Sequence, residues 1–227
     1  MRRSAAALLA FALLAACGGE SRRAPPATYV VKPGDTLYAI SWRHGLDYHD
    51  VARLNGIGPD YRIDVGQVLR LSSAAPPAAQ AGGGGAAAGT GSASPAFPAP
   101  LPVTPSPRWV WPADGTAGPT VHQPNGGLGL EIGGRAGDEV RAAASGRVVY
   151  TGSGLRGYGS LVIIKHDEAW LTAYGYNREL AVHEGESVRA GQRIAAMGEA
   201  PNHRAALYFE IRLNGRPVDP AGALPRR

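Results

Sequence analysis

The sequence predicts two folded modules, a small β-α-α-β unit and a larger all-β antiparallel domain, joined by a disordered linker. Three observations support this. Two helix-capping patterns lie between short β-favouring runs near the N-terminus. Residues 73–108 are dominated by Ala, Gly and Pro and contain too little apolar mass to fold. Beyond them, β-favouring runs alternate with Gly and Asp turns, and no helical period of useful length appears.

The N-terminus predicts export and lipidation. Basic Met1-Arg2-Arg3 precedes an apolar run over 5–16 that is too short to cross a bilayer. The run ends Leu14-Ala15-Ala16-Cys17, which resembles the bacterial lipobox and implies a signal peptide over 1–16 and acylation of Cys17. An ordinary secretory signal that happens to contain a cysteine is the alternative, but Cys17 is the only cysteine and stands at the cleavage position.

Residues 17–27 would then form a short lipidated tether. The residue directly after Cys17 is Gly18 and not an aspartate. By resemblance to Gram-negative lipoproteins, this implies sorting to the outer membrane, with the chain anchored on its periplasmic face through acylated Cys17.

The charge of the chain is weakly informative. The formal net charge is +5, of which Arg2 and Arg3 contribute two. A solvated surface explains so mild an excess, and an acidic cell-wall polymer is compatible with it. No nucleic-acid motif and no cofactor motif is present, so neither nucleic acid nor a cofactor is predicted.

The first module is expected over 28–72. A strand over 28–31 is followed by a helix capped by Asp35 or Thr36 and ended by Gly45. Asp47 caps a second helix that Asn55-Gly56 terminates, and a strand over 68–71 closes the unit.

Its motifs resemble a LysM module: Gly34-Asp35-Thr36-Leu37, then Leu54-Asn55, then Ile63-x-x-Gly66-Gln67. The resemblance implies binding of N-acetylglucosamine-containing glycans such as peptidoglycan. The implied glycan-binding residues are Gly34, Asp35, Thr36, Leu37, Asn55, Ile63 and Gly66. The simpler interpretation of the first loop is a turn and a helix cap, and the two interpretations are compatible.

The second module is expected over 109–227. Four β-favouring runs define it: 146–150, 161–165, 170–174 and 207–211. Arg156-Gly157-Tyr158-Gly159, Phe209-Glu210-Ile211-Arg212 and Val218-Asp219-Pro220 resemble the LytM (lysostaphin-like) peptidase domain. That resemblance implies a barrel-sandwich-like fold. It also implies a zinc ion held by a His-x-x-x-Asp pair and the second His of a His-x-His motif, with two further assisting histidines.

None of those five positions keeps its residue. The zinc pair falls on Gly127 and Glu131, and the His-x-His motif falls on Ala206-Leu207-Tyr208. The remaining assisting histidine falls on Tyr176, within Tyr174-Gly175-Tyr176. Glycine and alanine offer no ligand atom, and a phenol is a poor ligand at neutral pH. The sequence therefore predicts no metal and no catalytic residue, that is, a pseudoenzyme.

Other residues do not restore the chemistry. No pair of histidines has ligand spacing, so surface or hydrogen-bonded roles are expected for His122, His166, His183 and His203. The run from Val182 to Ile194 also resembles biotinyl and lipoyl carrier hairpins. Those hairpins need a lysine at the tip, and the only lysines here are Lys32 and Lys165.

Together, the lipobox, LysM module, linker and ligand-less LytM domain resemble the NlpD-like activators of cell-wall N-acetylmuramoyl-L-alanine amidases, which act in septal cell-wall splitting. The implied partners are peptidoglycan and a cell-wall amidase. The expected amidase groove is the former active site, formed by Gly127, Glu131, Tyr174, Tyr176, Ala206 and Tyr208.

Two further expectations concern this groove and the linker. A side-chain-sized space is expected where Gly127 replaces a histidine, and the linker is expected to uncouple the modules. Two other functions remain open: a structural tether between outer membrane and cell wall, and an active metallo-endopeptidase with an unusual ligand set.

Overall fold

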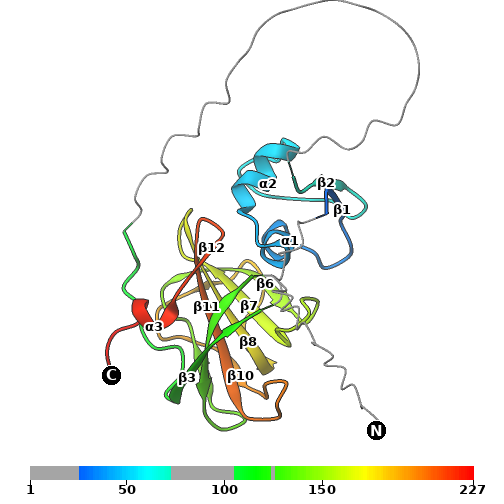
Figure 1. The fold of residues 1–227 in the computed structure, drawn as a ribbon. Coiled ribbons are helices and arrows are strands. Elements are labelled where there is room, and N and C mark those ends of the chain that lie inside the picture. Colours follow the sequence, from blue (N-terminus) through cyan, green and yellow to red (C-terminus); the bar gives the residue numbers. More distant parts are fainter. Residues whose placement is uncertain (1–25, 73–104, 124–125) are drawn as a thin grey trace, which may run out of the picture.

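The computed structural model describes residues 26–72, 105–123 and 126–227 (Figure 1). The predicted signal peptide, Cys17 and most of the predicted linker lie outside these residues. None of the helices in the described ranges is long and apolar enough to cross a membrane.

The first module has the predicted β-α-α-β order. Its elements are β1 (Thr28–Val30), α1 (Leu37–His44), α2 (Tyr48–Asn55) and β2 (Val68–Arg70). The Thr36 side chain accepts a hydrogen bond from the Ala39 amide, and the Asp47 side chain caps α2. Gly45 and Gly56 end the two helices with φ near +65°, a conformation that glycine adopts readily. The capping pattern therefore fixes both helices.

The second module is an antiparallel β domain, as predicted. Its strands are β3 (Thr116–His122), β4 (Leu128–Gly133), β5 (Glu139–Arg141), β6 (Gly146–Gly152), β7 (Ser160–Lys165), β8 (Trp170–Leu180), β9 (Ser187–Val188), β10 (Arg193–Met197), β11 (Ala206–Leu213) and β12 (Arg216–Val218). The main order is β3-β4-β11-β8-β7-β6-β9. β10 pairs with β8 and β5, and β12 pairs with β11. A short helix, α3 (Pro220–Ala223), follows the last strand.

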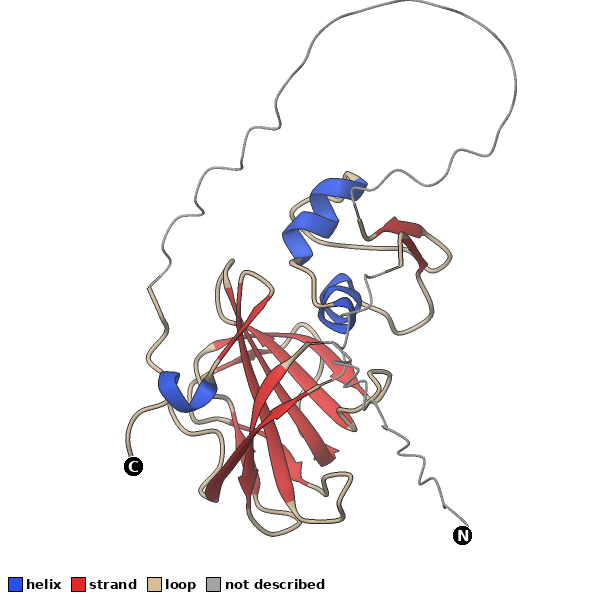
Figure 2. Cartoon of the chain, in the orientation of Figure 1, coloured by secondary structure: helices blue, strands red, loops and turns tan. Residues whose placement is uncertain are grey.

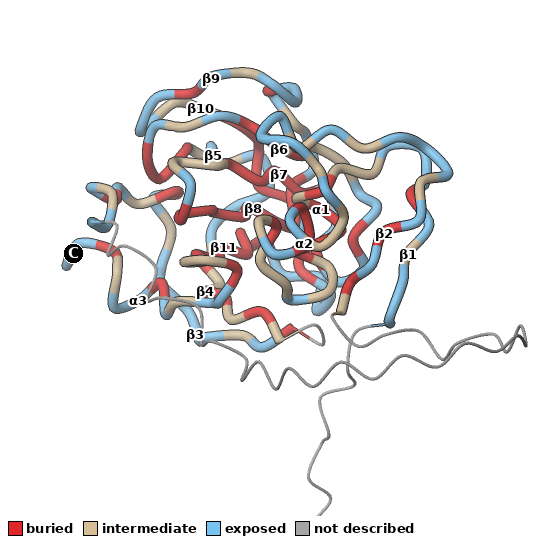
Figure 3. Tube along the Cα trace, turned by 90° about the horizontal axis from the view of Figure 1, so that it is seen from above, coloured by how far each residue is buried: buried red, intermediate tan, exposed pale blue. Residues whose placement is uncertain are grey.

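The two faces of this sheet bury different clusters. Tyr174 and Phe209 point into the main core, which also contains residues of β5 and β10. Neighbouring positions alternate across a strand, so Ala173 and Tyr208 point to the opposite face. Figure 3 shows the buried trace concentrated in the central strands.

The LysM-type module packs on that opposite face. Ala39, Trp42 and Tyr48 join one cluster with Tyr150 and Tyr208 of the β domain. Figure 2 shows α1 beside the sheet, with α2 further from it. The prediction that the linker uncouples the two modules is therefore wrong. The modules are in contact, because the second module buries an apolar surface of α1.

Candidate functional site

A buried polar strip occupies the face of β11 that carries Tyr208, one of the positions where the resemblance implies a metal ligand. Tyr208, Glu210 and Arg212 alternate along the strand and have exposed fractions of 0%, 0% and 1%. The Tyr208 hydroxyl donates to Glu210 Oε2 at 2.8 Å, and Arg212 Nε donates to Glu210 Oε1 at 2.6 Å. We call these three residues the Tyr208 strip. Its ion pair and hydrogen bond satisfy a carboxylate that would otherwise be costly to bury.

The strip ends at the LysM-type module. Arg212 Nη1 donates to the backbone oxygen of Trp42 at 3.1 Å. The guanidinium also lies 3.8 Å from the centroid of the Trp42 ring, which is a close cation–π contact. One network therefore joins the former metal position to α1.

No side-chain-sized space exists beside Gly127, so that expectation is wrong. Gly127 is buried, and a Cβ there would lie 2.7 Å from Glu210 Oε2 and 3.0 Å from the Tyr158 hydroxyl. Gly129 is equally close-packed, because its Cβ would meet the Tyr208 ring at 2.3 Å. The place of the missing histidine is filled by Glu210 and Tyr158.

The residues at this position do not fit the zinc ion that the fold family implies. A catalytic zinc needs three donor side chains and an open fourth place. Burial, followed by the charge of Glu210, raises the pKa of Tyr208, so its phenol remains a hydrogen-bond donor. Glu210 is already paired with Arg212. Among the described residues, no three His, Cys, Asp or Glu side chains are grouped to hold a metal.

The two predicted groove tyrosines of β8 lie in different environments. Tyr174 points into the main core, where its hydroxyl accepts from the Ala143 amide and from Thr172 Oγ1. Tyr176 has a φ of +62° and lies on the Tyr208 side, with the two ring centroids 5.6 Å apart. Only Tyr176 therefore contributes with Tyr208 to the same cluster.

An open pocket of about 780 Å³ lies at the other end of this face. Glu131 and Ala206, two of the predicted groove residues, line it together with β3 and the loop before β11. Glu131 is half-buried and has no ion-pair partner in the described part of the chain. We call this cavity the Glu131 pocket. It is an open cavity that two of the predicted groove residues line.

A second polar contact between the modules centres on Glu168. Tyr48 donates to its backbone oxygen at 2.9 Å, and His49 Nε2 lies 3.1 Å from its Oε2. Tyr61 also donates to Oε2 at 3.3 Å, and Lys165 donates to Oε1 at 2.6 Å. Two ionisable side chains, His49 and Glu168, therefore meet across the contact between the modules.

Docking of the modules is expected to weaken above neutral pH. Burial lowers the pKa of His49, but hydrogen bonds to Asp47 and Glu168 outweigh it and raise that pKa. The contribution of His49 is therefore complete below about pH 6.5 and is lost as pH rises through the raised pKa. For Glu168, burial raises the pKa, but bonds from Lys165 and His49 hold it at about 2. Its contribution is complete above about pH 4.3 and is lost below that.

Small-angle scattering tests this pH dependence. We expect a smaller radius of gyration at about pH 5.5 than at about pH 8.5. His49→Gln should remove the difference, whereas His183→Gln, at an exposed position, should keep it. Equal pH responses of the parent and His49→Gln would exclude His49 as the titrating group.

The predicted glycan-binding residues divide into exposed and structural positions. Gly34 and Gly66 are exposed, with φ of +79° and +86° and open space where a side chain would stand. Asp35 and Thr36 are half-buried, and Asp35 accepts from the Tyr29 hydroxyl at 2.7 Å. The exposed glycines keep the backbone of both loops accessible.

The other three predicted glycan-binding residues support the module itself. Leu37 is completely buried, and Ile63 packs against the same core. The Asn55 amide bonds to the backbone of Val51 and Arg70. A direct role in glycan contact remains a prediction for all seven residues.

The four histidines of the second module occupy surface or hydrogen-bonded positions, as predicted. His166 lies 2.8 Å from the Ser145 carbonyl and 2.8 Å from Thr172 Oγ1. His122, His183 and His203 are exposed.

Two known protein families match the two modules of this chain. A family described as LysM domain matches residues 29–72, and one described as Peptidase family M23 matches residues 125–220. The class of protein is thus a LysM module joined to a domain of the M23 peptidase fold.

Relatives then identify the family. The Lipoprotein NlpD/LppB homolog of Pseudomonas aeruginosa is 41% identical over 91% of this chain and 80% of the relative. The Murein hydrolase activator NlpD of Escherichia coli is 33% identical over 88% of this chain and 68% of the relative. The chain belongs to the NlpD/LppB family of lipoproteins.

The solved structure of lysostaphin from Staphylococcus simulans is 20% identical, covers 52% of this chain and 53% of its own, and has a TM-score of 0.45.

Proposed function

We propose that this chain is an outer-membrane lipoprotein that binds peptidoglycan through its LysM module and activates a cell-wall N-acetylmuramoyl-L-alanine amidase. Its M23-type domain would act as a non-catalytic binding surface. The names of its relatives support this, since they include murein hydrolase activators and outer membrane antigenic lipoproteins.

One observation carries the proposal. The former metal position is filled by the buried Tyr208–Glu210–Arg212 network, and the Gly127 position has no room for a ligand side chain. We infer that the domain keeps the sheet of a peptidase fold without metal-bound water, since the described residues hold no group of donors for a zinc ion. A retained binding surface without hydrolytic chemistry is what an activator requires.

The amidase is proposed to bind in the Glu131 pocket. This cavity is open, whereas the Gly127, Tyr174 and Tyr208 positions are closed by packing. Glu131 has no ion-pair partner among the described residues, so its carboxylate can pair with a basic group on the amidase segment. A charge pair formed across such a rim adds affinity and orients the partner.

Charge reversal at Glu131 tests this site. With the full mature chain, Glu131→Lys is expected to weaken amidase binding about tenfold, as measured by calorimetry. Glu179→Lys, which reverses an exposed carboxylate on β8, is the matched control and should bind as the parent does. Equal affinities for the parent and Glu131→Lys would place the amidase elsewhere on the domain.

The LysM module and the lipid anchor would determine where the chain acts. The LysM module would hold the chain on peptidoglycan, and acylated Cys17 would hold it at the outer membrane. Two attachments of this kind raise the local concentration of the activator at its substrate.

A further inference from the structure

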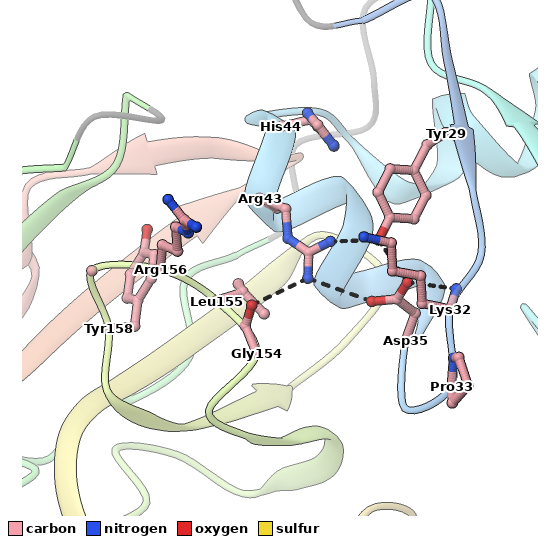
Figure 4. Close-up of a pocket in the computed structure, with 11 residues that line it drawn as sticks. Tyr29, Lys32, Pro33, Asp35, Arg43, His44, Gly154, Leu155, Arg156 and Tyr158 are labelled. Atoms are coloured by element: carbon pink, nitrogen blue, oxygen red, sulfur yellow. Dashed lines mark hydrogen bonds and ion pairs between the residues drawn. The ribbon is translucent and has the colours of Figure 1, made fainter.

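A cleft of about 710 Å³ lies between the two modules (Figure 4). One wall comes from the LysM module, through Tyr29, Lys32, Asp35 and Arg43. The other wall is the loop between β6 and β7, over residues 154–158. Neither module forms this inter-module cleft alone, so it depends on their docking.

Arg43 holds the walls together. Its Nη1 donates to the Tyr29 hydroxyl at 2.7 Å, and its Nη2 lies 3.4 Å from Asp35 Oδ1. The same Nη2 donates to the Gly154 carbonyl at 3.5 Å (Figure 4). Asp35 belongs to the predicted glycan-binding loop, so the cleft continues that loop towards the β domain.

The cleft carries a positive excess. The Lys32 ammonium and the Arg156 guanidinium are exposed, and neither has an ion-pair partner in the described ranges. The Arg43 charge is offset by Asp35. Burial, and then the charge of Arg43, lowers the pKa of His44, which favours its neutral form. Two cations without an ion-pair partner among the described residues, Lys32 and Arg156, therefore line opposite walls of the cleft.

We propose that this cleft binds a carboxylate-bearing cell-wall glycan, with the sugar at the Gly34–Asp35 loop and the carboxylate of its peptide stem between Lys32 and Arg156. Pro33 and Tyr29 offer the apolar edges against which a sugar ring packs. The guanidinium fork of Arg156 matches a carboxylate in geometry. The proposal rests on glycan binding by the LysM module and adds a contribution from the M23-type domain.

The test compares two soluble probes with the full mature chain. One is a neutral N-acetylglucosamine oligomer, and the other is a muropeptide of the same sugar length with free stem carboxylates. Affinities are measured by calorimetry at about 0.1 M salt, where exposed charges act only over about 10 Å. Arg156→Ala and Lys32→Ala alter the two walls separately, and Arg193→Ala changes an exposed arginine outside the cleft.

We expect the parent to bind the muropeptide more tightly than the neutral oligomer. Arg156→Ala and Lys32→Ala should each weaken muropeptide binding about tenfold and leave the neutral oligomer unchanged. Arg193→Ala should change neither affinity. Thermal melting verifies that each variant is folded, and Lys32→Ala provides the test if Arg156→Ala disturbs its loop.

Three results would overturn the proposal. Unchanged muropeptide binding in both folded cleft variants would remove the composite site while leaving the LysM function intact. An equal loss for both probes would show that the cleft does not recognise a carboxylate. A parent that binds neither probe would overturn glycan binding itself.

Discussion

Replacing Arg212 with leucine is expected to destabilise the chain by about 3–5 kcal/mol, because it leaves the buried Glu210 carboxylate without its charge partner. The midpoint of chemical denaturation should fall accordingly. Arg216→Leu, at an exposed position in the following strand, is the control and should change stability by less than about 0.5 kcal/mol.

A double variant separates the loss of the ion pair from the cost of burying an unpaired charge. In Glu210→Leu/Arg212→Leu no unpaired charge is buried, so part of the lost stability should return. Equal stability of the parent and Arg212→Leu would show that the ion pair is not buried in solution.

Trp42→Ala is expected to separate the modules while each remains folded. The Trp42 side chain is 2% exposed and packs between the modules on the Arg212 guanidinium. Removing a buried tryptophan costs about 3–5 kcal/mol in a protein core, enough to disfavour docking strongly. Small-angle scattering should show a larger radius of gyration, and circular dichroism an unchanged content of strand and helix.

Val65→Ala is the control for this substitution, because Val65 is an exposed apolar residue of the same module. An unchanged radius of gyration in folded Trp42→Ala would mean that Trp42 does not hold the modules together.

Local sequence signals predicted the first module and the class of the second. Caps at Thr36 and Asp47 and terminal glycines at 45 and 56 define both helices without tertiary information. The β8 strand is longer than predicted, running to Leu180. Its continuation includes Gly175 and Tyr176, and strand propensity does not predict the positive φ of Tyr176.

The sequence predicts which residues stand at the candidate site, but not how those residues pack. The substitutions at Gly127 and Tyr208 are visible in the sequence, whereas the closure of that space by Glu210 is a tertiary effect. A signal was present in β11, where Glu210 and Arg212 alternate with apolar residues in an otherwise buried strand.

No pattern in the sequence predicted that the two modules pack against each other. Trp42 and Tyr48 have the pattern of internal helix residues of a small module, and their partners lie more than a hundred residues away. A long predicted linker also favoured independent modules. The packing of α1 and of the start of α2 on the second module distinguishes these residues from a local core.

Release of label from purified, dye-labelled cell wall tests the proposed function most directly. The mature chain, the organism's purified amidase and the two together are compared, each with and without a zinc chelator. We expect no release by the chain alone, slow release by the amidase, and much faster release by the mixture. Chelator-sensitive release by the chain alone would contradict the account and indicate a peptidase, and a mixture no faster than amidase alone would contradict activation and favour a structural tether.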